Sequence, residues 1–212
     1  MTPVSRTVSL CLVFIVMVVS FSVYTQLQTP QLSEEELREA GVFILPRPRD
    51  LAGFNLVDHL GKPYNNEALV GRWSFIFFGF THCPDICPTT MSEMAKAERA
   101  LSQGAERDAG FQGVLVTVDP LRDSPEVMGE YVQAFSPRFL GVRADREATA
   151  LFAQQVNAAF GKVPSDDEDG YTMDHTGNIV IINPKGHYHG FIKSPHKAQT
   201  IQLTYQSLAA SF

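Results

Sequence analysis

Long apolar runs alternate with amphipathic segments along most of the chain. Residues 73–80 read WSFIFFGF and residues 111–118 read FQGVLVTV, and continuous apolar runs of this length are typical of strands covered on both faces. Elsewhere apolar residues recur at helical spacing, which predicts helices over residues 88–101, 125–135, 146–160 and 195–208. The first of these helices should bury Met91, Met94, Ala95, Ala97 and Leu101, and the third Leu151, Phe152, Val156 and Phe160.

Turn residues place the remaining strands. Residues 178–183 and 188–192 flank the sequence Pro184-Lys-Gly186 and predict a hairpin. Residues 54–57 belong to a smaller predicted hairpin, and residues 139–142 form a short predicted strand. Strands that alternate with helices, followed by a late hairpin and a terminal helix, predict an α/β fold in which a mixed sheet is flanked by helices. This order fits a thioredoxin-like fold, with a βαβ half before a ββα half.

The N-terminal region has a different pattern. Residues 8–24 read VSLCLVFIVMVVSFSVY, without a charge, and Arg6 precedes them. Extended to Leu27, the run has the ~20 residues that a membrane-spanning helix needs. Glutamates follow it at 34–36, so the charge asymmetry leaves residues 1–7 in the cytoplasm and exports the rest. We therefore predict a transmembrane anchor over residues 8–27.

A cleaved signal peptide is the alternative for this segment. A retained anchor is favoured, because the apolar run exceeds the ~7–15 residues usual for the apolar part of a signal peptide. No Arg-rich and Ser-rich presequence precedes the run, which favours a bacterial protein over an organelle protein. The predicted location is the bacterial inner membrane, crossed once, with the domain in the periplasm or on the extracytoplasmic face.

The exported part divides into a tether and one domain. Ser33 and Glu36 have the spacing of a capping box, and Leu37 and Gly41 follow them, so residues 28–41 should contain a short juxtamembrane helix. Residues 42–212 then form the thioredoxin-like domain. This division agrees with a length of 212 residues, which suits one domain plus appendages.

Composition and charge narrow the possible functions. The formal charge of −6 argues against binding of nucleic acid, which usually requires a basic face. Three cysteines are too few for a disulfide-rich scaffold. Cys11 falls in the predicted anchor, so the exported part has two cysteines, Cys83 and Cys87.

Cys83 and Cys87 lie where a predicted strand becomes a helix, in FGFTHCPDICP over residues 78–88. Pro88 suits the first helical turn, so Cys87 should lie near the helix N-terminus, whose partial positive charge lowers the pKa of a thiol. In an oxidising compartment the pair could form a structural disulfide, bind metal or stay reactive. The spacing is not the C-x-x-C-H of haem attachment, and the chain has no second C-x-x-C to complete a structural zinc site.

His175, in the sequence YTMDHTG, is the next candidate. A loop histidine on its own is more often a surface or capping residue. Two thiolates and one imidazole, however, match the ligand set of Cu(I), and of Cu(II) bound through thiolate. The spacing alone does not bring His175 to the cysteines, so only the fold can unite them. His82 and the pair His187 and His189 are weaker candidates.

Three segments resemble the Sco/SenC family of membrane-anchored, thioredoxin-fold copper proteins. They read FFGFTHCPDICPTTM, VTVDPLRDSPEVMGEYVQAF and DHTGNIVIINPKG, and the resemblance extends from about residue 43 to residue 212. It implies that Cys83, Cys87 and His175 bind one copper ion, as Cu(I) or Cu(II), and that Asp119 lies beside the site without ligating the metal.

The same resemblance implies a role and partners. The role is that of a copper metallochaperone that helps to mature the CuA site of cytochrome c oxidase. Its partners would be the CuA-bearing subunit or another copper-protein client, and a copper donor or thiol reductant.

A thiol–disulfide oxidoreductase is the alternative function. Cys83 and Cys87 would then be a redox-active pair that reduces the cysteines of a copper-site client, one thiolate attacking and the other resolving the mixed disulfide. His175 distinguishes the two hypotheses, because a dithiol exchanger does not need a remote histidine.

Overall fold

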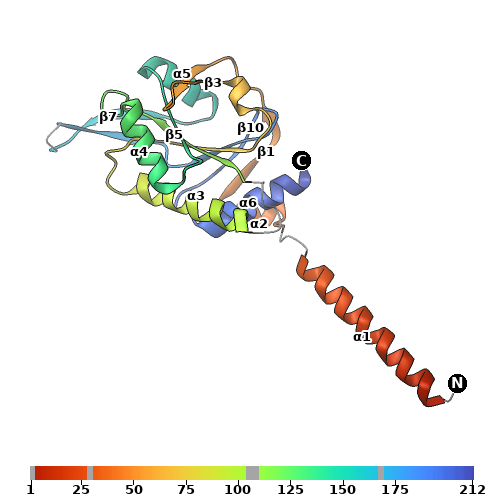
Figure 1. The fold of residues 1–212 in the computed structure, drawn as a ribbon. Coiled ribbons are helices and arrows are strands. Elements are labelled where there is room, and N and C mark those ends of the chain that lie inside the picture. Colours follow the sequence, from red (N-terminus) through yellow and green to blue (C-terminus); the bar gives the residue numbers. More distant parts are fainter. Residues whose placement is uncertain (1–2, 28–30, 104–109, 167–169) are drawn as a thin grey trace. The chain divides into compact units, whose positions relative to one another are not determined.

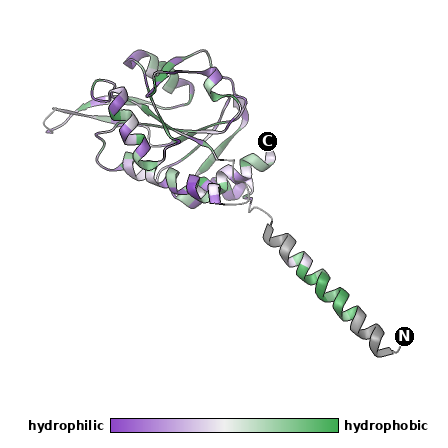
Figure 2. Ribbon diagram, viewed as in Figure 1, coloured by the Kyte–Doolittle hydropathy of each residue, from purple (hydrophilic) through white to green (hydrophobic). Residues whose placement is uncertain are grey.

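A computed structural model describes residues 3–27, 31–103, 110–166 and 170–212 of the chain. The chain divides into two compact units, Met1–Gln31 and Leu32–Phe212. The first unit contains the helix α1 (Pro3–Leu27), and Figure 2 shows apolar residues along the middle of this helix. Among the described residues, no helix is both long and apolar enough to span a membrane. The anchor over residues 8–27 therefore stays a prediction.

A mixed sheet forms the centre of the second unit (Figure 1). Within the described residues it has eight strands, in the order β1-β10-β9-β4-β5-β6-β2-β3. The central strands β4, β5 and β6 are parallel, whereas β9 and β10 are antiparallel. The strands are β1 (Val42–Arg49), β2 (Asn55–Asp58), β3 (Pro63–Asn65), β4 (Ser74–Gly79), β5 (Gln112–Thr117), β6 (Leu140–Arg143), β9 (Ile179–Ile182) and β10 (Tyr188–Ile192).

Helices cover this sheet. They are α2 (Glu34–Glu39), the short 3-10 helix η1 (Asn66–Leu69), α3 (Ile86–Gln103), α4 (Pro125–Phe135), α5 (Arg146–Gln155) and α6 (Ala198–Ser211). Helix α3 packs against both α4 and α6, and α5 contacts β2; Figure 1 shows α3 and α6 side by side. The predicted thioredoxin-like α/β fold is confirmed.

Apolar burial fixes the strand and helix that will carry the two cysteines. The side chains of β4 from Phe75 to Phe78 are at most 1% exposed, as the apolar run predicts, and each contributes about 1.5–3 kcal/mol through burial. The predicted apolar positions of α3 are likewise buried, namely Met91, Met94, Ala95, Ala97 and Leu101. The junction between β4 and α3 is therefore held rigidly at both ends.

The third predicted helix is partly wrong. Helix α5 ends at Gln155, and Phe160 begins β7 (Phe160–Pro164), which pairs with β8 (Tyr171–His175) in a separate two-stranded sheet. Asn157 has a positive φ of 57°, a left-handed conformation that asparagine tolerates and that stops a helix. Leu151, predicted to be buried, is 58% exposed.

The edge strand β1 escaped prediction because it contains Pro46 and Pro48. Only β10 pairs with it among the described strands, and its register shifts between Ile44 and Arg49, a setting in which proline is tolerated.

The predicted tether over residues 28–41 lies partly outside the described residues, which omit 28–30. Residues 32–41 belong to the second compact unit. The capping box forms as predicted, with Ser33 and Glu36 bonded reciprocally at the start of α2. Leu37 of this helix is 4% exposed, and the Leu32 N–H donates to Ser207 Oγ at 2.7 Å.

Candidate metal centre

The two cysteines lie at the junction between β4 and α3. Cys83 is half-buried in the connecting turn, where its N–H donates to the Phe80 carbonyl at 3.3 Å. Cys87 lies in the first turn of α3 and is fully buried. Gly79 makes room for it, since a Cβ at that position would lie only 2.8 Å from Cys87 Sγ.

His175 approaches from the last position of β8. Its ring stands edge-on to the rings of Phe77 and Phe80, with centroids 5.6 and 6.0 Å away. His175 Nδ1 lies 3.3 Å from the Thr176 carbonyl oxygen, which only accepts, so the ring proton of this bond resides on Nδ1. Nε2 then keeps a free lone pair, the arrangement usual for a histidine that binds metal.

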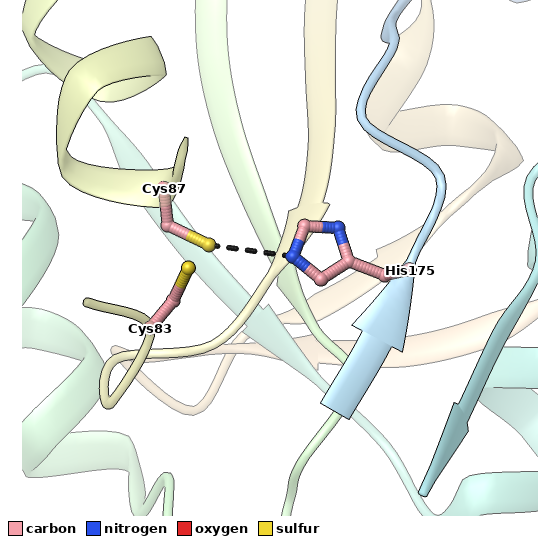
Figure 3. Close-up of side chains that lie close together, drawn as sticks. All are labelled: Cys83, Cys87 and His175. Carbon is pink, nitrogen blue, oxygen red and sulfur yellow. Dashed lines mark hydrogen bonds between the residues drawn. The ribbon is translucent and has the colours of Figure 1, made fainter. Parts of the chain in front are cut away.

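The three side chains converge on one point. Cys87 Sγ lies 3.5 Å from His175 Nε2, and Figure 3 shows both sulfur atoms close to the imidazole. The three ligand atoms all lie within 4.8 Å of one another. Metal–sulfur bonds of ~2.3 Å and metal–nitrogen bonds of ~2.0 Å require about this separation. Within the described residues, this is the cluster of His, Cys and acidic side chains that is placed to hold an ion.

The two thiols have opposite pKa shifts. A hydrogen bond from the Cys87 thiol lowers the pKa of Cys83, against the effect of partial burial. The same hydrogen bond raises the pKa of Cys87, and burial raises it again. The expectation that Cys87 has the lowered pKa is therefore wrong. The hydrogen bond to Cys83 and the burial of Cys87 raise the pKa of Cys87 more than the helix N-terminus lowers it. The thiolate therefore resides on the more exposed Cys83.

Asp123 holds the turn that contains Cys83, a role that the sequence did not reveal. Its carboxylate is fully buried and accepts from the Thr81 hydroxyl at 2.6 Å, from the Thr81 N–H at 3.2 Å and from the Thr117 hydroxyl at 2.5 Å. These bonds join the β4–α3 turn to the end of β5. In the sequence Asp123 only marks the start of α4, where Ser124 is the N-cap.

Asp119 lies behind the cluster rather than in it. Its carboxylate, 3% exposed, accepts from Arg122 Nε at 2.5 Å and from the Tyr171 hydroxyl at 3.1 Å. The Arg122 guanidinium lies 4.2 Å from the centroid of the Tyr171 ring and 5.7 Å from that of Phe80. Asp119 thus connects to His175 through Arg122 and Phe80.

The other histidines lie outside the cluster. The His82 side chain is 51% exposed and 3.9 Å from Asp123, His187 pairs with Asp50 at 3.2 Å, and His189 packs edge-on against Trp73. His196, which no sequence pattern marks, is buried and lies 3.0 Å from Thr90 Oγ1. Its ring packs edge-on against Phe77, and burial lowers its pKa.

The fold and the cluster together define a class of protein. A thioredoxin-like sheet positions a turn with two thiols, and a separate hairpin adds an imidazole, which gives a Cys2His donor set suited to copper.

Comparison with known proteins gives the family. The SCO1/SenC family model matches residues 46–210, and the chain belongs to this family. A protein of Stutzerimonas stutzeri named as copper-binding is 38% identical over 167 residues, which cover 78% of this chain and 80% of that protein. The mitochondrial SCO2 homologue of Mus musculus is 34% identical, over 86% of this chain and 68% of its own length.

A solved structure supports the same assignment. The chain superimposes on Bradyrhizobium japonicum ScoI with copper bound at a TM-score of 0.64. The two sequences are 32% identical, and the match covers 73% of this chain and 96% of the other.

Proposed function

We propose that the protein is a copper metallochaperone that holds one copper ion, Cu(I) or Cu(II), between Cys83, Cys87 and His175. The observation that carries this proposal is the convergence of two sulfur atoms and one imidazole nitrogen within 4.8 Å. Copper in the similar Bradyrhizobium japonicum structure and the name of the Stutzerimonas stutzeri relative support copper as the ion.

The arrangement of the ligands suits transfer as well as binding. Cys87 and His175 hold the ion from the interior, whereas Cys83 is half-exposed and ionises most readily. A thiolate of a client can therefore replace Cys83 first, so that copper moves by ligand exchange. If an external oxidant removes two electrons from the two copper-bound thiolates, they join in a disulfide, and the ion loses both sulfur ligands and is released.

The client proposed for this transfer is the CuA-bearing subunit of cytochrome c oxidase, or another copper protein. A copper donor loads the site, or a thiol reductant converts the Cys83–Cys87 disulfide back to two thiols. Membership of the SCO1/SenC family supports this role.

The proposed location is the bacterial inner membrane. Residues 8–27 form the anchor, residues 1–7 face the cytoplasm, residues 28–41 are the tether, and residues 42–212 form a domain in the periplasm. The uncharged apolar run and the charges around it support this topology. Extraction of membranes with alkali tests it: the full-length chain should stay in the pellet, and a shortened chain in the soluble fraction would establish the signal peptide instead.

A thiol–disulfide oxidoreductase is the second candidate function. The half-exposed Cys83 with its lowered pKa favours it, because an accessible thiolate attacks disulfides. In that case Cys83 attacks the client disulfide, and Cys87 resolves the mixed disulfide as the client thiol leaves with a proton.

Copper titration of His175→Ala separates the two functions. The reduced full-length chain in detergent should retain one equivalent of Cu(I) against a competing chelator, and Cu(II) should give a thiolate charge-transfer band. Loss of a ligand should weaken binding by about 100-fold or more, since even loss of a ligand's hydrogen-bond partner costs ~10–100-fold. The variant should still form the Cys83–Cys87 disulfide, and His187→Ala should bind copper normally.

Two results would reject the chaperone function. One is failure of the reduced protein to retain copper against the chelator. The other is equal copper affinity of the His175→Ala variant and the unchanged protein. Reduction of a client disulfide in either case would establish the oxidoreductase.

A further inference from the structure

A cavity of about 610 Å³ lies beside the metal centre, against the hairpin that carries His175. We refer to it as the β8 groove. It is lined by the loop after β5, the ends of β2 and β6, the start of α5 and the strands β7 and β8. The residues that matter here are Val57, Leu121, Arg143, Arg146, Lys162 and Tyr171.

The groove exposes apolar side chains to solvent. Leu121 is 86% exposed and Val57 is 44% exposed, and prolines and Met173 continue the apolar lining between them. An exposed apolar patch of this kind, rimmed by charges, commonly marks a site where another molecule binds.

Three cations and three acids line the groove. Arg143, Arg146 and Lys162 form no ion pair within the described residues, and Arg143 Nε is buried there without a hydrogen-bond partner. The acidic side chains of the lining are held by contacts within the protein.

Each of those acids has a local role. Asp119 is neutralised by Arg122, Asp58 accepts from the backbone N–H groups of Leu60 and Lys62, and Asp145 caps α5. Asp58 and Asp145 keep their negative charge, so three cations face two carboxylates without an ion-pair partner, and the lining has a small net positive charge, although the whole chain has a net charge of −6.

The face of β8 that lines the groove leads on to the metal centre. Tyr171, Met173 and His175 occupy alternate positions of β8, and alternate residues of a strand share one face. Tyr171 and Met173 line the groove. His175 is the last residue on the same face of the strand and lies beside the two sulfur atoms. A chain bound along the groove would therefore extend toward the ligands.

We propose that the β8 groove docks an acidic segment of a partner protein in which Leu or Phe alternates with Asp or Glu. The apolar side chains cover Leu121 and Val57, and the carboxylates pair with Arg146 and Lys162. The assignment of the partner as the protein that exchanges copper rests on the proposed function. Docking on this face places its metal-binding residues beside Cys83 and His175.

Fluorescence anisotropy with a labelled peptide tests the groove. The probe is a short synthetic peptide in which Asp and Glu alternate with Leu and Phe, added to the full-length chain in detergent. We expect saturable binding that weakens with salt, and no binding of a matched peptide with Lys in place of the acids. Leu121→Ser and Arg146→Glu should each weaken binding about tenfold.

Matched variants provide the controls. Leu151→Ser removes an exposed leucine of α5 that does not line the groove, and Lys193→Glu reverses an exposed charge elsewhere. Both should bind the peptide normally. All four variants should retain Cu(I) as the unchanged protein does, so that a failure of docking is distinguished from a failure of copper binding.

Three results would overturn the proposal. The first is no binding of the acidic peptide, and the second is equal weakening by the control variants. The third is binding of inorganic phosphate alone at the groove, which would make it a site for small anions.

Discussion

The two sulfur atoms of the metal centre differ in exposure and therefore in chemistry. In the metal-free protein Cys87 is fully buried and keeps its proton, whereas Cys83 is half-exposed and gives its proton up readily. The buried sulfur retains the ion while the exposed one meets the partner. Gly79 makes this difference possible, because the space where its Cβ would lie is filled by Cys87 Sγ.

Gly79→Ala should damage both the fold and the site. The new Cβ would lie 2.8 Å from Cys87 Sγ and 3.1 Å from the Phe77 ring, and such overpacking costs about 1–3 kcal/mol. Thermal unfolding should show this loss, and chelator competition should show weaker Cu(I) binding. Gly53→Ala is the control, since nothing lies within 4 Å of a Cβ there. Equal stability of the two variants would contradict the packing argument.

The lowered pKa of Cys83 predicts an unusual pH dependence of alkylation. With its thiol already ionised at pH 6, Cys83 in the reduced, copper-free protein should react with iodoacetamide at a nearly constant rate from pH 6 to pH 8. An ordinary thiol of pKa ~8.5 gains about tenfold in thiolate per pH unit over this range. Mass spectrometry of the Cys83 peptide, with N-acetylcysteine as the reference, measures the two rates.

The same ionisation affects stability. Because the pKa of Cys83 is lower in the folded than in the unfolded chain, it stabilises the fold above the unfolded value and the effect is lost as pH falls through the folded value. A Cys83 rate that rises tenfold per pH unit, like the reference, would show that the pKa is not lowered.

At the scale of elements, one buried carboxylate joins two loops. Asp123 lies after β5, yet its hydrogen bonds reach Thr81 in the turn between β4 and α3. The turn with Cys83 is therefore fixed at its two ends by β4 and α3, and Asp123 also holds it at Thr81.

Asp123→Asn tests this connection. The amide has only one acceptor oxygen, and its NH2 would face donors of Thr81 and Thr117, so the free energy of unfolding should fall by about 1–3 kcal/mol. Copper affinity should fall with it, because the turn no longer holds Cys83 in place. Asp50→Asn, at a side chain that is 89% exposed, should change neither quantity in urea unfolding and chelator competition. A variant as stable as the unchanged protein would refute the role of Asp123.

Elements that depend on local sequence could be predicted, and those that depend on distant contacts could not. The buried strands β4 and β5, and α4 with Ser124 as N-cap, follow from apolar runs and capping residues. The hairpin of β7 and β8 was missed. A left-handed Asn157 ends α5 early, and pairing across the hairpin, rather than its composition, makes the strands.

At the scale of the whole molecule, the site unites parts of the chain that are far apart. The turn after β4 supplies Cys83, the first turn of α3 supplies Cys87, and the separate hairpin supplies His175. The spacing of residues did not bring His175 to the cysteines; the family resemblance suggested it. Asp123 and His196 had no recognisable motif, since their roles depend on contacts across the fold.

Copper should therefore stabilise the hairpin more than the rest of the domain. Bound Cu(I) ties β8 to α3, so hydrogen exchange of backbone amides in β7 and β8 should slow on loading, while the hairpin of β2 and β3 should not change. An ion at 100 times its dissociation constant stabilises the folded state by about 2.7 kcal/mol. Removal of the ion with a chelator should restore the original rates, measured by mass spectrometry.

His175→Ala loaded with Cu(I) is the matched control. Without the imidazole, no bond joins the ion to the hairpin, so exchange in β7 and β8 should stay fast. Equal protection of the hairpin in this variant would show that His175 does not bind the ion.

Because Cys87 and His175 lie far apart along the chain, full copper affinity depends on a folded domain. The two residues are 88 positions apart, and closing a loop of this length in an unfolded chain costs about 4 kcal/mol. A chain that is unfolded, or truncated before His175, does not hold this imidazole beside the two thiols. Full affinity thus appears only after the last third of the domain has docked, and a misfolded molecule cannot compete with a folded one for scarce copper.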